Sequence, residues 1–102
     1  MSHPRLVLLV KFKSPLSLEE VQGVVDSRID QFRALPGLTQ KYYLQDSASG
    51  EYAGLYLWES AEALSEFRES ELRSTIAEAY RTEGAPRVEV FQIFDVLRES
   101  PA

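Results

Sequence analysis

Apolar and polar residues are spaced with the period of a strand in some segments of the chain and with the period of a helix in others. Four segments are rich in strand-forming residues and are bounded by turn-forming ones. These predicted strands are residues 5–12, 38–45, 51–59 and 87–97. Residues 46–50 (DSASG), between the second and third strands, form a turn cluster. These two strands are therefore predicted to pair as a hairpin.

Two further segments have the period of a helix with one buried face. In the first segment, apolar residues recur at Leu18, Val21, Val25, Ile29 and Phe32. Ser17 and Glu20 have the spacing of a capping box, in which each side chain accepts a hydrogen bond from the other residue's backbone amide. The second helical region is expected to begin after Ser60, which is placed to cap it. A break is predicted near Ser70, and Gly84 follows the end of the helical region.

The order β-α-β-β-α-β predicts an α+β, ferredoxin-like domain with both helices on one face of a four-stranded antiparallel sheet. In a monomer the other face meets water and is expected to be polar. Here it is apolar, because Leu8 and Val10 alternate with Val7 and Leu9 along the first strand. A large apolar face marks an interaction surface, and a second copy of the same sheet is its simplest cover. The sequence therefore predicts a homodimer through the sheet face.

Composition narrows the classes of function. The chain is expected to form one domain, residues 1–102, which is long enough to bury a core without metal or disulfides. It has no cysteine, which excludes disulfides, thiolate metal sites and cysteine nucleophiles. A net charge of −5 and the lack of a basic stripe argue against nucleic-acid binding. Neither a bilayer-spanning apolar run nor a signal peptide is recognised, so we expect a cytoplasmic protein with no membrane partner.

Several short stretches give the chain a resemblance to a known superfamily. They are the leucine-rich first strand, Pro36-Gly37-Leu38 followed by Lys41, the hairpin at 46–50, YAGLYLW at 52–58, ESAEA at 59–63, and VFQIFDV at 90–96. With these stretches the chain resembles the dimeric α+β barrel superfamily and, within it, the small YdhR-like monooxygenases. The resemblance implies two ferredoxin-like domains with facing sheets, and a pocket in each protomer between sheet and helices. It also implies a cofactor-independent monooxygenase, because related antibiotic-biosynthesis monooxygenases oxidise phenolic or polyketide substrates with molecular oxygen and no bound cofactor.

Cofactor-free oxygenation requires aromatic walls, a donor for the developing oxyanion and a base. The candidates for substrate binding are Tyr56, Trp58, Gln92 and Phe94, and the catalytic candidates are Lys41 and Tyr43. Tyr56 and Trp58 lie two residues apart on one strand, where large aromatic side chains are most often core residues. A strand lysine is most often solvated, but burial of Lys41 beside the pocket would lower its pKa. Gln92 interrupts an apolar alternation and must find a hydrogen bond.

The sequence also bears on haem, metal and nucleotide sites and leaves two alternative functions open. His3 is the only histidine and lies near the chain terminus, which argues against a haem ligand. Neither a metal-binding cluster nor a glycine-rich nucleotide fingerprint occurs, so no metal and no cofactor is expected. The alternatives are a non-catalytic dimer that binds a small molecule, and an isomerase or decarboxylating enzyme of the same architecture. Gly54 shares a face with Tyr56 and Trp58, and whether that face lines a pocket or a dimer interface is left open.

Overall fold

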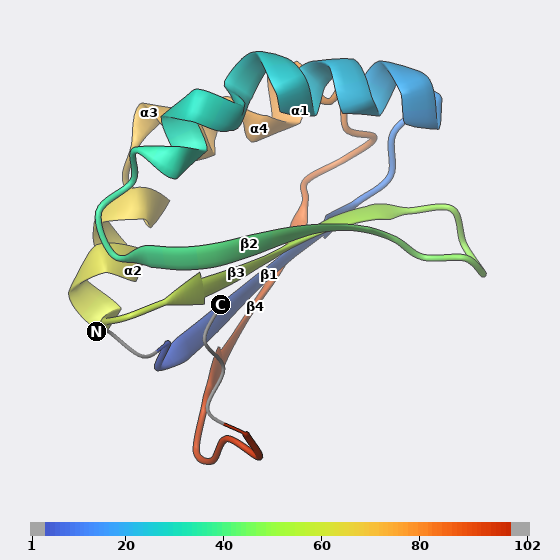
Figure 1. The fold of residues 1–102 in the computed structure, drawn as a ribbon. Coiled ribbons are helices and arrows are strands. Elements are labelled where there is room, and N and C mark those ends of the chain that lie inside the picture. Colours follow the sequence, from blue (N-terminus) through green and yellow to red (C-terminus); the bar gives the residue numbers. More distant parts are fainter. Residues whose placement is uncertain (1–3, 99–102) are drawn as a thin grey trace.

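The computed structural model describes residues 4–98 and has the predicted ferredoxin-like architecture (Figure 1). Its elements are β1 (Leu6–Phe12), α1 (Leu18–Arg33), β2 (Leu38–Gln45), β3 (Tyr52–Trp58), α2 (Ala61–Arg68), α3 (Glu71–Ser74), α4 (Ile76–Ala79) and β4 (Arg87–Gln92). The strands form one sheet in the order β2-β3-β1-β4, and every neighbouring pair is antiparallel. All the helices lie on one side of this sheet (Figure 1).

The register of the central strands places one set of side chains in the core. Leu8 of β1 lies opposite Tyr56 of β3, and Val10 lies opposite Gly54. Side chains on this face are buried under the helices, while the intervening positions of β3 are only partly buried. The main core residues are Leu8, Val10, Phe12, Val21, Val25, Phe32, Tyr52, Tyr56, Trp58, Leu64, Phe67, Ile76 and Tyr80. Tyr56 and Trp58 therefore face the helices.

Hydroxyl groups cap the helices where the sequence predicts it. Ser17 and Glu20 form the capping box of α1, with Glu20 N donating to Ser17 Oγ and Ser17 N donating to Glu20 Oε1. Ser60 accepts from the amide of Ala63 at the start of α2. Ser70 caps α3 in the same way, which explains the predicted break in the second helical region. None of the helices among residues 4–98 has the length and apolar character needed to cross a membrane.

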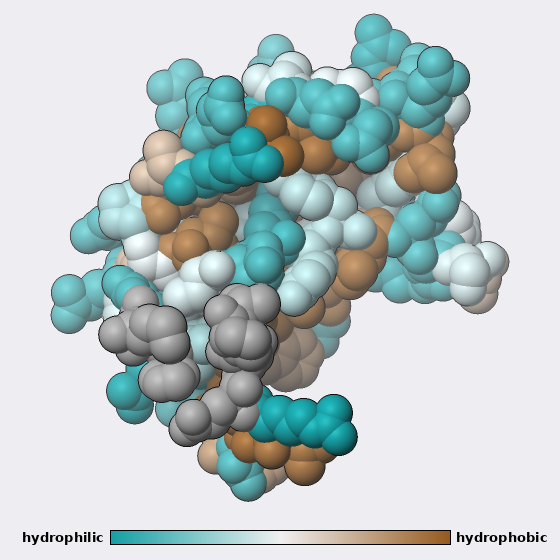
Figure 2. Space-filling view, in the orientation of Figure 1, coloured by the Kyte–Doolittle hydropathy of each residue, from teal (hydrophilic) through white to brown (hydrophobic). Residues whose placement is uncertain are grey.

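The last strand is shorter than the sequence predicts. The alternation of apolar residues continues to Leu97, but β4 ends at Gln92. The strand ends there because its partner ends: β4 pairs with β1, and the first residue of β1, Leu6, lies opposite Gln92. One more hydrogen bond follows, from the amide of Ile93 to Arg5 O at 2.8 Å. Residues 93–98 then leave the sheet as a C-terminal arm, and the side chains of Phe94 and Leu97 are 98% and 94% exposed. The arm stands clear of the body at the bottom of Figures 1 and 2.

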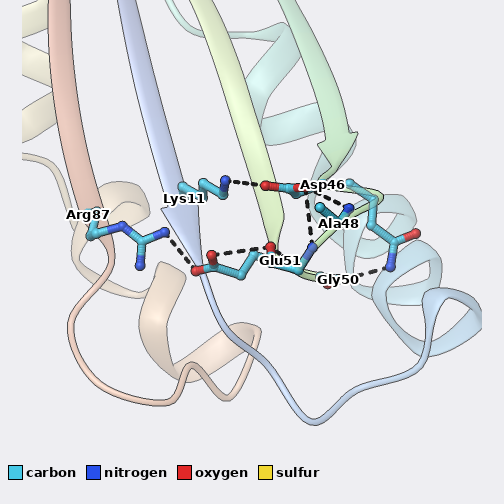
Figure 3. Close-up of polar contacts among 8 residues, drawn as sticks. Lys11, Asp46, Ala48, Gly50, Glu51 and Arg87 are labelled. Carbon is cyan, nitrogen blue, oxygen red and sulfur yellow. Dashed lines mark hydrogen bonds and ion pairs between the residues drawn. The ribbon is translucent and has the colours of Figure 1, made fainter.

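Within residues 4–98, no helix lies on the other side of the sheet (Figure 1), and most of the strand residues on that side are apolar. We call this side the open face; its apolar residues are Val7, Leu9, Tyr42, Leu44, Ala53, Leu55, Leu57 and Phe91. At one end of the sheet two ion pairs join β1 and β4 to the turn between β2 and β3: Lys11 with Asp46 at 2.6 Å, and Arg87 with Glu51 at 2.7 Å (Figure 3). Charged groups thus border one end of the open face.

Candidate functional site

Lys41 lies inside a ring of aromatic side chains on the helix side of the sheet. It belongs to β2 and lies opposite Tyr56 of β3 in the strand register. Its Nζ is 3.5 Å from the ring centroid of Phe32 in α1, 4.3 Å from that of Tyr56 and 4.4 Å from that of Tyr43. Rings at these distances attract a cation through their electron-rich faces. Of the ion pairs among residues 4–98, none includes Lys41.

Gly54 makes the room that Lys41 and Tyr56 occupy. A Cβ atom at Gly54 would lie 2.9 Å from Tyr56 Cε1 and 3.3 Å from Lys41 Cε. The first distance is shorter than van der Waals contact, and the Tyr56 ring is itself packed against Trp58 and Phe67. The glycine thus leaves space for the lysine and tyrosine side chains of the site itself.

Replacing Gly54 with alanine is expected to lower the free energy of unfolding by about 1–3 kcal/mol, because overpacking forces the Tyr56 ring or the strand to move. Gly23→Ala is the matched control, since nothing lies within 4 Å of a Cβ there. Gly23 is inside α1, where alanine is expected to stabilise the helix by about 0.5–1 kcal/mol. Urea unfolding of both variants measures the difference, and equal effects in the two would contradict the packing argument.

Burial and a neighbouring charge change the acidity of Lys41. Burial is the main cause and the charge of Arg28 the second, and together they lower the pKa of Lys41 to about 7. Arg28 is held in place on α1 because its Nη2 donates to Leu72 O at 2.8 Å and to Thr75 Oγ1 at 3.2 Å. Near neutral pH the Lys41 amine is therefore neutral in some molecules and protonated in others, in comparable amounts, as expected for a partly buried lysine.

The tyrosine hydroxyls around Lys41 stay protonated. Burial raises the pKa of Tyr43 and of Tyr56, and it raises the pKa of Tyr80 to about 12. Phenols with raised pKa values are neutral hydrogen-bond donors at physiological pH. The site thus combines an amine able to accept a proton with phenol groups able to donate hydrogen bonds.

Two hollows meet at Lys41 and Tyr43. The inner cavity, between sheet and helices, has about 30 Å³ of free space. It is bordered by Val10, Phe12, Val21, Val25, Lys41, Tyr43, Leu44, Tyr52, Ala53, Gly54, Tyr56, Ile76 and Tyr80. The outer groove, between β2 and α1, has about 310 Å³ and is bordered by Ile29, Phe32, Arg33, Leu38, Thr39, Gln40, Lys41 and Tyr43. The side chains of Lys41 and Tyr43 border both, and so lie between the cavity and the groove.

The predicted substrate-binding residues lie in three different places. Tyr56 borders the inner cavity, whereas Trp58 is 0% exposed and stacks on Tyr56 at a centroid distance of 6.3 Å. The indole Nε1 of Trp58 has no hydrogen-bond partner among the described residues. Gln92 is exposed at the end of the edge strand β4. Phe94 belongs to the C-terminal arm and borders a separate surface hollow with Pro4 and Arg5.

Sequence reasoning did not assign Phe32, Tyr80 or Arg28 to the site. Phe32 appeared only as one position of the helix period, and Tyr80 lies in the second helical region. Arg28 carried no signal, because a helix arginine is ordinarily solvated. His3 lies outside the described residues. Among residues 4–98, no three histidine, aspartate or glutamate side chains converge as they would around a metal ion.

Solved structures of similar fold include two oxygenases. SnoaB, a cofactor-independent oxygenase from Streptomyces nogalater, aligns with a TM-score of 0.73 and 16% identity over 95% of this chain and 100% of its own. The monooxygenase ActVA-Orf6 of Streptomyces coelicolor, solved with nanaomycin D, aligns with a TM-score of 0.69 and 18% identity over 95% of this chain and 94% of its own. Rv0793 from Mycobacterium tuberculosis aligns with a TM-score of 0.72 and 19% identity over 91% of this chain and 98% of its own.

The sequence itself matches no protein-family model, and no curated protein is recognisably similar to it. The likeness to the solved structures, at these identities, is therefore a likeness of fold. It extends over nearly the whole chain and includes the four-stranded antiparallel sheet with helices on one face. The chain has an α+β, ferredoxin-like fold, which it shares with SnoaB and ActVA-Orf6.

Proposed function

We propose that the chain is a cofactor-independent monooxygenase that oxidises a small phenolic substrate bound beside Lys41. The observation that carries this proposal is the Lys41 amine, which lies among three aromatic rings and between the inner cavity and the outer groove. Two proteins of the same fold, SnoaB and ActVA-Orf6, are oxygenases, which supports the reaction class.

The outer groove is the part of the site that has room for a substrate. An apolar cavity of about 150 Å³ holds one benzene molecule, so the inner cavity of about 30 Å³ is too small for an aromatic ring. The groove, at about 310 Å³, is large enough for a ring system placed beside Phe32 and Tyr43. The aromatic rings of Phe32 and Tyr43 in its wall favour the stacking of a flat molecule.

In the proposed reaction Lys41 acts as the base. The neutral amine takes the phenol proton, and the resulting ammonium then lies beside the phenolate and stabilises it. Tyr43 borders the groove and is the candidate to donate a hydrogen bond to the anion, since its hydroxyl stays protonated. The electron-rich phenolate reacts with molecular oxygen at the para carbon. One oxygen atom becomes the new carbonyl of a quinone, the other leaves as water, and the substrate supplies all the electrons.

We also infer that two copies of the chain pair through the open face. Apolar residues of all four strands lie on this face, and among residues 4–98 no helix or strand covers it. Burial of such a surface is the usual reason for a two-fold dimer. The C-terminal arm adds Phe94, Val96 and Leu97, whose exposed side chains would also be covered by a partner.

Oxygen uptake in the presence of 1-naphthol, followed with an oxygen electrode, tests the proposed reaction. The wild-type chain is expected to form 1,4-naphthoquinone, and Lys41→Met is expected to be at least about a hundredfold slower, since a positioned base contributes at least that much. Lys13→Met is the matched control, because Lys13 is exposed on the surface.

The alternative, a dimer that binds a small molecule without turnover, gives a different result in the same experiment. The wild type would then bind 1-naphthol, measured by calorimetry, but would consume no oxygen above the buffer rate. That outcome would overturn the monooxygenase proposal and favour the binding protein.

A further inference from the structure

The chain has three lysines, and their surroundings differ sharply. Lys11 is paired with Asp46 at 2.6 Å, and Lys13 is exposed. Lys41 alone lies among aromatic rings, and within residues 4–98 no carboxylate is paired with it. A lysine without a counter-ion in an apolar site contributes little to folding, so a chemical role is the more economical explanation of its position.

The groups that face Lys41 come from three elements and none of them is acidic. Phe32 and Arg28 come from α1, Tyr43 comes from β2 itself, and Tyr56 comes from β3. Removal from water and a neighbouring cation are the two conditions that make a lysine amine nucleophilic. Both conditions are met here, because the aromatic rings surround Nζ and Arg28 is held nearby by Leu72 O and Thr75 Oγ1.

The geometry points to a second activity of this site: Lys41 captures small apolar aldehydes or ketones from the outer groove as a Schiff base. The nitrogen lone pair attacks the carbonyl carbon and gives a carbinolamine. The hydroxyl of the carbinolamine takes up a proton and leaves as water, the nitrogen loses its remaining proton, and a carbon–nitrogen double bond results. No oxidant, reductant or metal is consumed. The groove of about 310 Å³ has room for an aromatic or short aliphatic carbonyl compound beside Phe32.

Benzaldehyde with sodium cyanoborohydride at pH 7 tests the inference, because the reductant converts a Schiff base into a stable benzyl-lysine. Peptide mapping by mass spectrometry then compares Lys41 with Lys13 in the same wild-type molecules. With a pKa of about 7, half of the Lys41 amine is neutral at pH 7, whereas an ordinary lysine amine is neutral in roughly one molecule in two thousand. We expect benzylation of Lys41 to be about a hundredfold faster than that of Lys13, since a less basic amine is also somewhat less nucleophilic.

Two controls make the outcome decisive. In urea, where the fold is lost, the preference for Lys41 should disappear; in folded Lys41→Met, confirmed by circular dichroism, no other lysine should take its place. Equal labelling of Lys41 and Lys13 in the folded wild type would overturn the inference.

The experiment is carried out without oxygen, so it is independent of the proposed monooxygenase. Labelling at Lys41 without oxygen uptake on 1-naphthol would support the Schiff base and overturn the monooxygenase. Oxygen uptake without preferential labelling of Lys41 would support the monooxygenase and overturn the Schiff base.

Discussion

Replacing Phe91 with glutamate is expected to turn a dimer of this chain into a monomer. Phe91 is 49% exposed in the isolated chain and lies on the open face, opposite Val7 of β1. In a two-fold interface both protomers carry the substitution, so two charges are buried. Each unpaired charge that is buried costs about 3–5 kcal/mol. The dissociation constant is expected to rise by at least about a thousandfold, which corresponds to about 4 kcal/mol.

Sedimentation equilibrium or light scattering over a range of concentrations measures this change as a halved mass. Ser65→Glu adds the same charge on the exposed side of α2 and should leave the dimer intact. A wild-type chain that is monomeric at every concentration would contradict the pairing of open faces. A Phe91→Glu variant that stays dimeric would place the interface elsewhere.

The free energy of unfolding is expected to rise with pH between 7 and 9.5 in the wild type more than in Lys41→Met. The pKa of Lys41 is about 7 in the folded chain, and that of an unfolded lysine is about 10.4. Between these values the unfolded chain holds a proton that the folded chain has released, so raising the pH favours folding. The slope approaches about 1.4 kcal/mol per pH unit, and the difference over the range is expected to be about 2–3 kcal/mol. Well below pH 7 both states carry the proton, and the difference between the two variants no longer changes with pH.

Urea unfolding of the two variants at one protein concentration measures this linkage, because concentration also changes the stability of a dimer. The upper limit of pH 9.5 avoids the tyrosines: the raised pKa values of Tyr56 and Tyr80 make stability fall with pH once unfolded tyrosines ionise near pH 10. Lys13→Met should follow the wild-type curve. Parallel curves for the wild type and Lys41→Met would mean that Lys41 titrates as a solvated lysine.

Local chemistry made much of the fold predictable. The bounds of β2 match the predicted strand at 38–45, and the Ser17–Glu20 capping box marks the start of α1. These features depend on residues near in sequence, such as a side chain that reaches a backbone amide three positions away. The end of β4 was mispredicted because a strand ends where its partner ends, and the partner β1 lies far away in the sequence.

The orientation of YAGLYLW in β3 shows the limit of sequence patterns most clearly. Both faces of this strand carry large apolar side chains, so alternation alone cannot say which face meets the helices. Packing of Phe32 and Phe67 against Tyr56 decides it, and it makes Trp58 a core residue behind the site. The same packing surrounds Lys41, a residue that most often is solvated on a strand.

The sequence by itself determined the order of the elements, the helix caps, the hairpin and an apolar second face of the sheet, because each depends on short-range periodicity or on a single side chain and its neighbours. Only the tertiary structure decided that Lys41 lies among Phe32, Tyr43 and Tyr56 with Arg28 nearby. The acidity of an amine is set by the dielectric and the charges around it, and these come from elements distant in the chain.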